Sequence, residues 1–281
     1  MHRPAYAAVF STFLRNSLVR EMTFRANFLI ECLSSVTWTL MNLGFYLLIF
    51  HHTDQFGSGW GKWEFFVFLS TTMIVNSIVQ AFFMPNCEEV SELIRTGGLD
   101  FALLKPIDTQ FLISLQKVDW SALANLAAGL ILLVVSLTQL HTRTENPLPL
   151  TTSALMLYPL FVVCGVGIMY SLMIALSSTS IWLGRNQSLY DFWFYITNFA
   201  RYPMEIYEGA VGGPLRFAFT FVVPVLLVVN VPARLLARPL YPQSSIDWSL
   251  PLFTLAATMV ALLLSRWLFL AALSGYRSAS S

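Results

Sequence analysis

The sequence predicts an all-α protein that crosses a membrane six times, and two observations favour this fold class. Hydrophobic residues make up 56% of the 281 residues, whereas Asp, Glu, Lys and Arg make up only 11%, roughly half the share that is usual in a soluble domain. The charges also leave long uncharged stretches at 32–53, 65–87, 120–142, 146–184, 217–233 and 248–265. Most of these stretches approach the roughly 20 residues that a helix needs to cross the hydrocarbon core.

This composition excludes a soluble enzyme, a disulfide-rich secreted protein, a nucleic-acid binder and a disordered tail. A soluble fold of this size could not bury so much apolar surface, so part of that surface must face lipid. The cysteines, Cys32, Cys87 and Cys164, are scattered and form no CxxC pair. They therefore indicate neither a zinc site nor a disulfide framework.

Residues 4–22 are expected to form a helix in the cytoplasmic interface. Apolar side chains recur there at helical spacing, while Arg15, Asn16 and Arg20 lie off that stripe; the apolar positions are Tyr6, Phe10, Phe13, Leu14, Leu18 and Met22. A helix with one apolar face and a polar opposite face is typical of a segment that lies in the plane of the membrane surface. The alternative is that these residues simply extend the first span.

The first four spans are predicted at 26–50, 64–84, 119–140 and 153–183. The positively charged residues in the short connections lie mostly on one side: Arg3, Arg15, Arg20, Arg25, Arg95, Lys105, Lys117 and Arg185, against Lys62 and Arg143. Because short cytoplasmic loops are enriched in Lys and Arg, the N-terminus is expected in the cytoplasm. A last span at about 250–273, followed by Arg277, places the C-terminus there too.

The region between Arg185 and Asp247 must then contain an odd number of crossings, and two segments compete for it. Segment 189–207 is aromatic but carries charges, whereas segment 214–236 is more apolar but contains Pro214, Pro224 and Pro232. Proline interrupts a helix, and broken backbone at membrane depth is tolerated where protein surrounds it. We therefore expect 189–207 to be the fifth crossing and 214–236 a re-entrant hairpin on the outer side.

The largest cytoplasmic connection, residues 85–118, is expected to hold a short, well-capped helix. Asn86 can cap its start, with Glu88 and Glu89 in its first turn. Arg95 falls in the last turn, and Gly97 or Gly98 can supply the left-handed stop. Apolar residues follow in a segment that should be at the surface: Leu99, Phe101, Leu103 and Leu104. They indicate either a docking surface for a partner or packing on neighbouring helix ends.

The motifs of several enzyme classes are missing from the sequence. The glycine-rich segment 57–62 lacks the spacing of a phosphate-binding loop, and neither HExxH nor GxSxG occurs. No motif therefore supports ATP binding, metalloprotease activity or serine-hydrolase activity. His51, His52 and His141 lie at outer span ends and are expected to be solvated rather than metal-bound. The first four spans have no ionisable residue at their middles, which disfavours a proton path.

One motif resembles a known family. The segment IRTGGLDFALLKP at 94–106 resembles the IRxGxLDfxLlrP signature of a branch of ABC type-2 exporter permeases. Gly59, Trp60 and Glu64 resemble the family's Gly-Trp…Glu before the second span. Residues 201–203, with Pro224 and Pro232-Ala233, resemble its late proline pattern.

The resemblance implies a permease without ATPase activity, with six spans, an N-terminal elbow helix and an outer re-entrant segment, in the inner membrane of a bacterium. It implies a separate ABC ATPase subunit in two copies, which binds ATP and Mg²⁺, and a second permease chain, identical or homologous. Besides these partners only membrane lipid is expected, with no nucleic acid and no cofactor on this chain.

By the same resemblance, residues 86–95 are the coupling helix that docks on the ATPase, and 96–106 support it. The residues expected in this coupling loop are Glu88, Glu89, Glu92, Arg95, Gly98, Leu99, Asp100, Phe101, Lys105 and Pro106. Two other functional classes remain as alternatives to the exporter permease. They are an ion-coupled secondary transporter and an intramembrane lipid-modifying enzyme, the latter using polar residues around Asp191, Arg201, Glu205 and Glu208. The sequence indicates no substrate.

Overall fold

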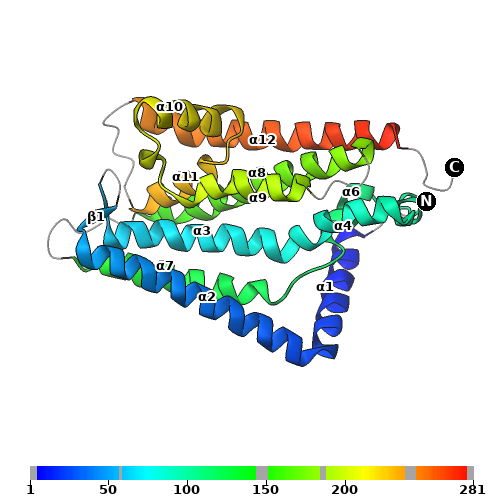
Figure 1. Ribbon diagram of the computed structural model, residues 1–281, viewed down its shortest axis with the longest axis horizontal. Helices are drawn as coiled ribbons and strands as arrows, with labels where there is room; N and C mark the ends of the chain where they lie inside the picture. Colours follow the sequence, from blue (N-terminus) through cyan, green and yellow to red (C-terminus); the bar gives the residue numbers. More distant parts are fainter. Residues whose placement is uncertain (1–4, 57–58, 144–150, 184–187, 238–244, 277–281) are drawn as a thin grey trace.

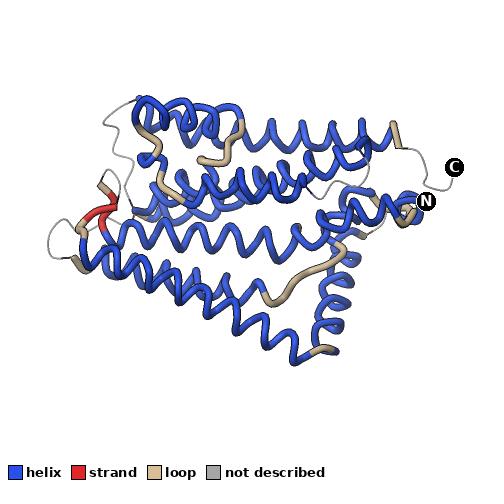
Figure 2. The backbone as a smooth tube through the Cα atoms, viewed as in Figure 1, coloured by secondary structure: helices blue, strands red, loops and turns tan. Residues whose placement is uncertain are grey.

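The structure, a computed structural model, describes residues 5–56, 59–143, 151–183, 188–237 and 245–276. Within these ranges the regular secondary structure is helical apart from one small hairpin, β1 (Gln55–Phe56) and β2 (Trp60–Gly61), and loops join the helices (Figure 2). By length and composition, 5 helical segments could cross a membrane, or up to 6 if a bent helix pair counts as one span. The predicted fold class is confirmed: all-α, with an N-terminal helix and a bent pair before the last helix.

Five long helices run side by side along the long axis of the molecule (Figure 1). They are α2 (Arg25–His52), α3 (Lys62–Phe82), α7 (Ala122–His141), α8 (Thr152–Leu183) and α12 (Ser245–Ser274). They occupy the segments predicted as spans one to four and six, with ends that differ by a few residues. Of the charges used to predict orientation, Arg3, Arg185 and Arg277 lie outside the described residues.

The two ends of the bundle differ. One end, called the α1 end below, carries α1, α4, α6 and the last turns of α12, whereas the other, the hairpin end, carries β1 and α10 (Figure 1). The core is built around α3, which contacts α7, α8 and α11, and around α8, which contacts α11 and α12. Helix α2 lies at the edge of this arrangement, contacts α7, and has no buried residue.

The N-terminal helix α1 (Tyr6–Thr23) is separate from α2 rather than an extension of it. The chain leaves helical geometry at Phe24, and α1 runs across the direction of the bundle (Figure 1). It is held by the segment before α7: the Ser17 hydroxyl accepts a hydrogen bond from the Val118 N–H (3.1 Å). The Tyr6 and Phe111 rings also meet edge to face at 5.0 Å. The predicted residue 4 lies outside the described residues.

The segment 189–207, predicted as the fifth crossing, is not one continuous helix. The segment divides into α9 (Ser188–Asn198) and two single 3₁₀ turns, η1 (Phe199–Arg201) and η2 (Met204–Ile206). Pro203 is the physical reason, since a proline disfavours helical backbone at the residue before it and Tyr202 is indeed extended. At about 1.5 Å per residue, the 11 residues of α9 are too short to cross a bilayer alone.

The bent pair lies where the re-entrant segment 214–236 was predicted. Helix α10 (Gly209–Phe217) continues into the π-turn η3 (Ala218–Val222), and α11 (Leu227–Ala237) follows after a bend of 95°. Pro224 falls in the break, whereas Pro214 and Pro232 lie inside the helices. A buried ion pair between Glu205 and Arg234 fixes η2 to α11. Every residue of α11 is buried or nearly so, so this helix is part of the core.

Candidate functional site

The predicted cytoplasmic loop begins with α4 (Met84–Arg95), which follows α3 almost without interruption. Pro85 occupies its first turn, where proline is favoured because the N–H it lacks would have no helical partner. The helix therefore starts before Asn86, and the predicted cap at Asn86 with Glu88 and Glu89 in the first turn is wrong. Arg95 does lie in the last turn. Helix α4 packs along α8.

Asn86 instead joins the two ends of the loop. Its side-chain Nδ2 donates to the Lys117 carbonyl (2.7 Å), and its Oδ1 accepts from the Lys117 N–H (2.8 Å). The side chain is only 3% exposed, and buried polar groups that are fully paired fix the backbone around them. The Glu89 carboxylate pairs with the Lys117 ammonium beside it. Together these contacts bring the start of α4 and the end of the loop together.

A left-handed glycine ends α4, as predicted. Gly97 has φ +73°, a backbone conformation that glycine adopts without a Cβ penalty. The short α5 (Gly98–Leu103) follows, and a Cβ added at Gly98 would lie 2.9 Å from the Leu93 side chain. The turn therefore packs α5 directly against the end of α4.

The apolar residues of α5 and the residue after it divide into two groups. Leu99 is fully buried and anchors the helix, whereas Phe101 is 72% exposed and Leu104 81% exposed, with Leu103 beside them at 40%. We call Phe101, Leu103 and Leu104 the α5 tip. The sequence left two alternatives for these residues, packing on neighbouring helix ends or a docking surface. Leu99 packs inside the protein, whereas the α5 tip is an exposed apolar surface.

The remaining predicted coupling residues lie on α4, within α5 and directly after α5. Glu88 is exposed on α4, and Lys105 and Pro106 are exposed after α5. Arg95 is paired with Glu92 on the exposed side of α4, with Arg95 Nε 2.8 Å from Glu92 Oε2. Asp100 lies near Tyr276, after the last helix, and burial together with the Asp100 carboxylate raises the pKa of that tyrosine.

The loop is also tied to the long helices through α6 (Thr109–Leu115). Asp108 caps α6 by accepting from the Phe111 N–H (2.9 Å), and it pairs with Arg266 of α12 (Nη1–Oδ1 3.1 Å). Gln110 accepts from the same guanidinium (2.9 Å) and donates to the Tyr170 hydroxyl of α8 (2.9 Å). Burial alone would raise the pKa of Asp108, but the hydrogen bonds from Arg266 and from Phe111 lower it.

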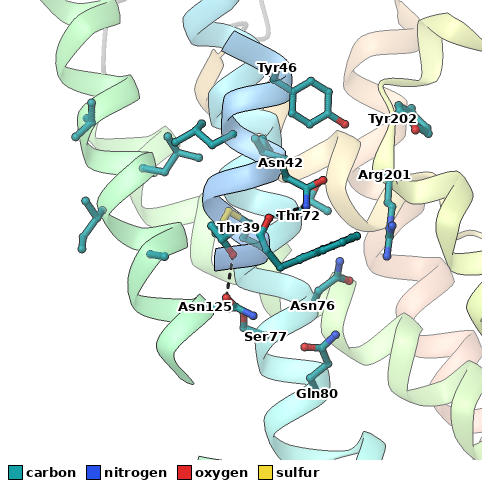
Figure 3. Close-up of a pocket in the computed structure, with 18 residues that line it drawn as sticks. Thr39, Asn42, Tyr46, Thr72, Asn76, Ser77, Gln80, Asn125, Arg201 and Tyr202 are labelled. Atoms are coloured by element: carbon teal, nitrogen blue, oxygen red, sulfur yellow. Dashed lines mark hydrogen bonds between the residues drawn. The ribbon is translucent and has the colours of Figure 1, made fainter. Parts of the chain in front are cut away.

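A second site, which the sequence did not indicate, is a cavity of 540 Å³ between α2, α3 and α7. At the hairpin end, Phe65 packs against Tyr46 (4.8 Å between ring centroids) and Phe56 (4.6 Å). Towards the α1 end α2 diverges from α3 (Figure 1), and the cavity lies between them. Its polar lining comes from four elements: Thr39, Asn42, Tyr46, Thr72, Asn76, Ser77, Gln80 and Asn125, with Arg201 and the adjoining Tyr202 (Figure 3).

These polar residues could not be assembled from the sequence, because they come from α2, α3, α7 and η1 and meet only when these elements are packed together. The one usable signal was amide side chains on otherwise uncharged spans. Neither this cavity nor the loop offers a metal site: within the described ranges, no cluster of three or more His, Cys, Asp or Glu residues could hold a metal ion.

Comparison with known proteins agrees with this architecture. Residues 36–280 match the family described as ABC-2 family transporter protein. No curated protein and no solved structure matches the chain significantly. The match begins within α2, covers α3, α7, α8, α12, the bent pair and the loop with the α5 tip, and includes most of the sequence. This chain therefore belongs to the ABC-2 family of transporter proteins, whose members work with ABC ATPase partners.

Proposed function

We propose that this chain is the permease subunit of an ATP-driven exporter, and that ATP and Mg²⁺ bind to a separate cytoplasmic ATPase subunit present in two copies. The α1 end then faces the cytoplasm. Membership of the ABC-2 transporter family supports the transport function. The observation that carries the docking assignment is the α5 tip, an exposed apolar surface on an otherwise anchored loop.

The energetics favour a partner for the α5 tip. Burying a side chain such as Phe or Leu contributes about 1.5–3 kcal/mol, and Phe101 and Leu104 leave most of that unused in the isolated chain. Charged groups accompany the tip in the same loop: Lys105 follows it directly in the chain, and the exposed Arg95–Glu92 pair lies at the end of α4. An apolar centre with a polar rim is the usual anatomy of a protein interface.

The anchors of the loop explain how docking could reach the membrane. Asn86 and the packing of α4 on α8 fix the first half of the loop. Asp108 and Gln110 join α6 to Arg266 of α12. When the ATPases close on ATP, a displacement of the α5 tip would therefore move α8 and α12 rather than bend the loop. Residues 86–95 are the proposed coupling helix that docks on the ATPase and transmits this motion, and the α5 tip in the supporting segment 96–106 adds its exposed apolar contacts.

The assembly includes a second permease chain, identical or homologous, in the inner membrane of a bacterium. The apolar side chains of α2 support this, since the helix buries none of its residues within the described chain and must meet lipid or a partner. The segment IRTGGLDFALLKP at 94–106 supports assignment to the exporter branch that carries the IRxGxLDfxLlrP signature.

The test is copurification from native membranes. The tagged chain should bring down a subunit with ABC ATPase motifs and MgATP hydrolysis, identified by mass spectrometry and phosphate release. Replacing both Phe101 and Leu104 with alanine should remove apolar contact area from the interface and lower the recovered ATPase at least about tenfold, which corresponds to about 1.4 kcal/mol.

The matched control is Phe217→Ala at the hairpin end, a comparably exposed phenylalanine (63%) that should leave ATPase recovery unchanged. All variants should give the same elution profile and thermal midpoint as the parent chain. Copurification without any ATPase, or full recovery with the Phe101/Leu104 double variant, would contradict the proposal. Transport driven by an ion gradient alone would favour the secondary-transporter class.

A further inference from the structure

The cavity between α2, α3 and α7 contains a charge at the depth of the long helices. Its lining includes Arg201, which is the one charged residue among the lining side chains. Figure 3 shows the Arg201 guanidinium at about the level of Asn76, between Asn42 and Gln80. Asn76 lies about 21 Å along α3 from Lys62 at a rise of 1.5 Å per residue. The guanidinium is therefore beside the interior of α3 and not at its end.

Within the described residues, no carboxylate pairs with Arg201. Its recorded contact is with an aromatic ring, the guanidinium carbon lying 5.6 Å from the Phe194 centroid. Arg234 and Arg266, by contrast, are paired with carboxylates, Arg234 with Glu205 and Arg266 with Asp108. A cation–π contact is worth about 0.5–2 kcal/mol, which offsets only part of the cost of a charge at membrane depth.

Neutral hydrogen-bonding groups lie at the same level. In the described part of the chain the Asn76 and Gln80 amides are not engaged in any hydrogen bond, and in Figure 3 both point into the cavity, towards the side on which Arg201 lies. Asn125 is already bonded to Thr39 (3.0 Å) and holds α7 to α2. Asn76 and Gln80 are thus available to an occupant of the cavity.

The rest of the lining is apolar. Leu43, Leu69, Met73, Ile131, Leu132 and Val135 face the same space. The volume of 540 Å³ falls within the roughly 300–1,000 Å³ of small-molecule sites, which likewise combine apolar walls with a few polar groups. A cationic occupant would be repelled by Arg201, and a purely apolar one would leave Arg201, Asn76 and Gln80 unpaired, which is costly at low dielectric.

We propose that this cavity binds an anionic amphiphile, with its carboxylate or phosphate head on Arg201, Asn76 and Gln80 and its apolar chain along α7, and that such amphiphiles are the substrate class of the transporter. The proposal that the cavity binds such an amphiphile concerns this chain alone and does not depend on an ATPase. The substrate assignment additionally rests on the proposed exporter function. Guanidinium is suited to the head group because its planar donors pair with two anionic oxygens at once.

The binding test uses Trp38, which lines the cavity and is 63% exposed. The chain, purified into phosphatidylcholine nanodiscs, is titrated with dibromostearate, whose bromine atoms quench tryptophan fluorescence on contact. The methyl ester of dibromostearate is the matched neutral probe. Saturable quenching by the acid, at least about tenfold tighter than by the ester, is expected. Trp38→Phe should remove the saturable part of the quenching, since other exposed tryptophans such as Trp267 (64%) meet the probe only through the lipid. Equal saturable quenching with this variant would place the probe elsewhere and overturn the proposal.

Variants distinguish the loss of the Arg201 charge from a general loss of folding. Arg201→Gln should weaken binding of the acid about tenfold or more, because hydrogen bonds to a charged group are worth about 1.5–3 kcal/mol, and should leave the ester unchanged. Arg201→Lys should retain part of the affinity, and Asn76→Leu should weaken it less than Arg201→Gln does. Arg216→Gln, outside the cavity, is the control. Equal affinity of the parent chain and a well-folded Arg201→Gln variant would overturn the proposal.

A second arm distinguishes a transported amphiphile from a resident membrane lipid. In the purified complex with its ATPase, stearate should stimulate ATP hydrolysis, and Arg201→Gln should abolish that stimulation. Arg216→Gln, outside the cavity, should keep both the basal hydrolysis and the stimulation. Binding of dibromostearate without stimulation would make the occupant a structural lipid and overturn the substrate assignment. Loss of ATPase recovery in the Phe101/Leu104 variant bears only on the proposed docking, so the two proposals fail separately.

Discussion

Single residues set how closely the helices of this bundle approach one another, and Gly165 of α8 is the clearest example. A Cβ at this position would lie 2.6 Å from the Val228 carbonyl oxygen of α11, closer than unstrained atoms approach. Pro232 lies four residues after Val228 and has no N–H to donate back to that carbonyl. The close contact between α8 and α11 therefore depends on the missing side chain at 165.

Gly165→Ala should destabilise the protein by about 1–3 kcal/mol, the usual cost of overpacking a core. The measurement is the thermal midpoint in detergent, which should fall. Gly44→Ala is the matched control, since nothing lies within 4 Å of a Cβ there and alanine is the better helix former; its midpoint should stay unchanged or rise. An equal decrease in both variants would show that the effect belongs to glycine replacement in general.

Among the polar residues, those with local roles could be predicted from the sequence, and those with distant partners could not. Arg95 in a last turn and Gly97 as a helix stop follow from local rules that need only a few neighbouring residues. The role of Asn86 does not, because its partner Lys117 is 31 residues away and a local rule assigns it to a cap. Arg201 and Asn76 likewise become a site only when the packing of α2, α3 and α7 is known.

At the scale of elements, the link between α6 and α12 is the contact most open to a direct test. Arg266 joins Asp108, which is also the cap of α6. Arg266→Gln should loosen α6 and raise amide hydrogen exchange in peptides that cover 109–115, measured by mass spectrometry. Arg95→Gln, which removes an exposed ion pair within α4, should leave exchange in α6 unchanged. If α6 exchanged equally in the two variants, the link between α6 and α12 would have no mechanical role.

The same pair has a defined pH dependence. The lowered pKa of Asp108 means that its stabilising contribution is complete above the ordinary aspartate value of about 3.9 and is lost as the pH falls through the lowered pKa. Because both side chains are about a third exposed, the contribution should be about 1 kcal/mol or less. The difference in thermal midpoint between the parent chain and Arg266→Gln should be constant from about pH 5 to 8 and shrink below about pH 4. A difference that grew with acidity would contradict this assignment.

The long helices were predictable and the segment 188–237 was not, for a physical reason. Uncharged runs of about 20 residues have few alternatives to a helix at membrane depth, because lipid cannot pair with backbone polar groups. Segment 188–237 instead buries its irregular backbone inside the protein, where Asn230 accepts from the Met204 N–H (2.9 Å) and Arg234 pairs with Glu205. Such tertiary partners allow a break at Pro203 that hydropathy does not reveal.

The whole molecule raises the question of which segment supplies the fifth crossing. Helices α2, α3, α7 and α8 alternate in direction, and α12 ends at the α1 end (Figure 1). The chain between α8 and α12 therefore passes once, in net, from the α1 end to the hairpin end. We expect α9, η1 and η2 to make that passage, with the bent pair of α10 and α11 at the outer side.

Cysteine accessibility tests this topology in a background in which Cys32, Cys87 and Cys164 are replaced. Single cysteines at Thr53 and Ala210 should react with a membrane-impermeant maleimide in intact cells. Single cysteines at Thr96 and Ser274 should react only after permeabilisation, because the α1 end carries most of the Lys and Arg residues of the short connections. If Ala210→Cys behaves like Thr96→Cys, α10 begins on the cytoplasmic side, and the bent pair is the crossing instead of the segment before it.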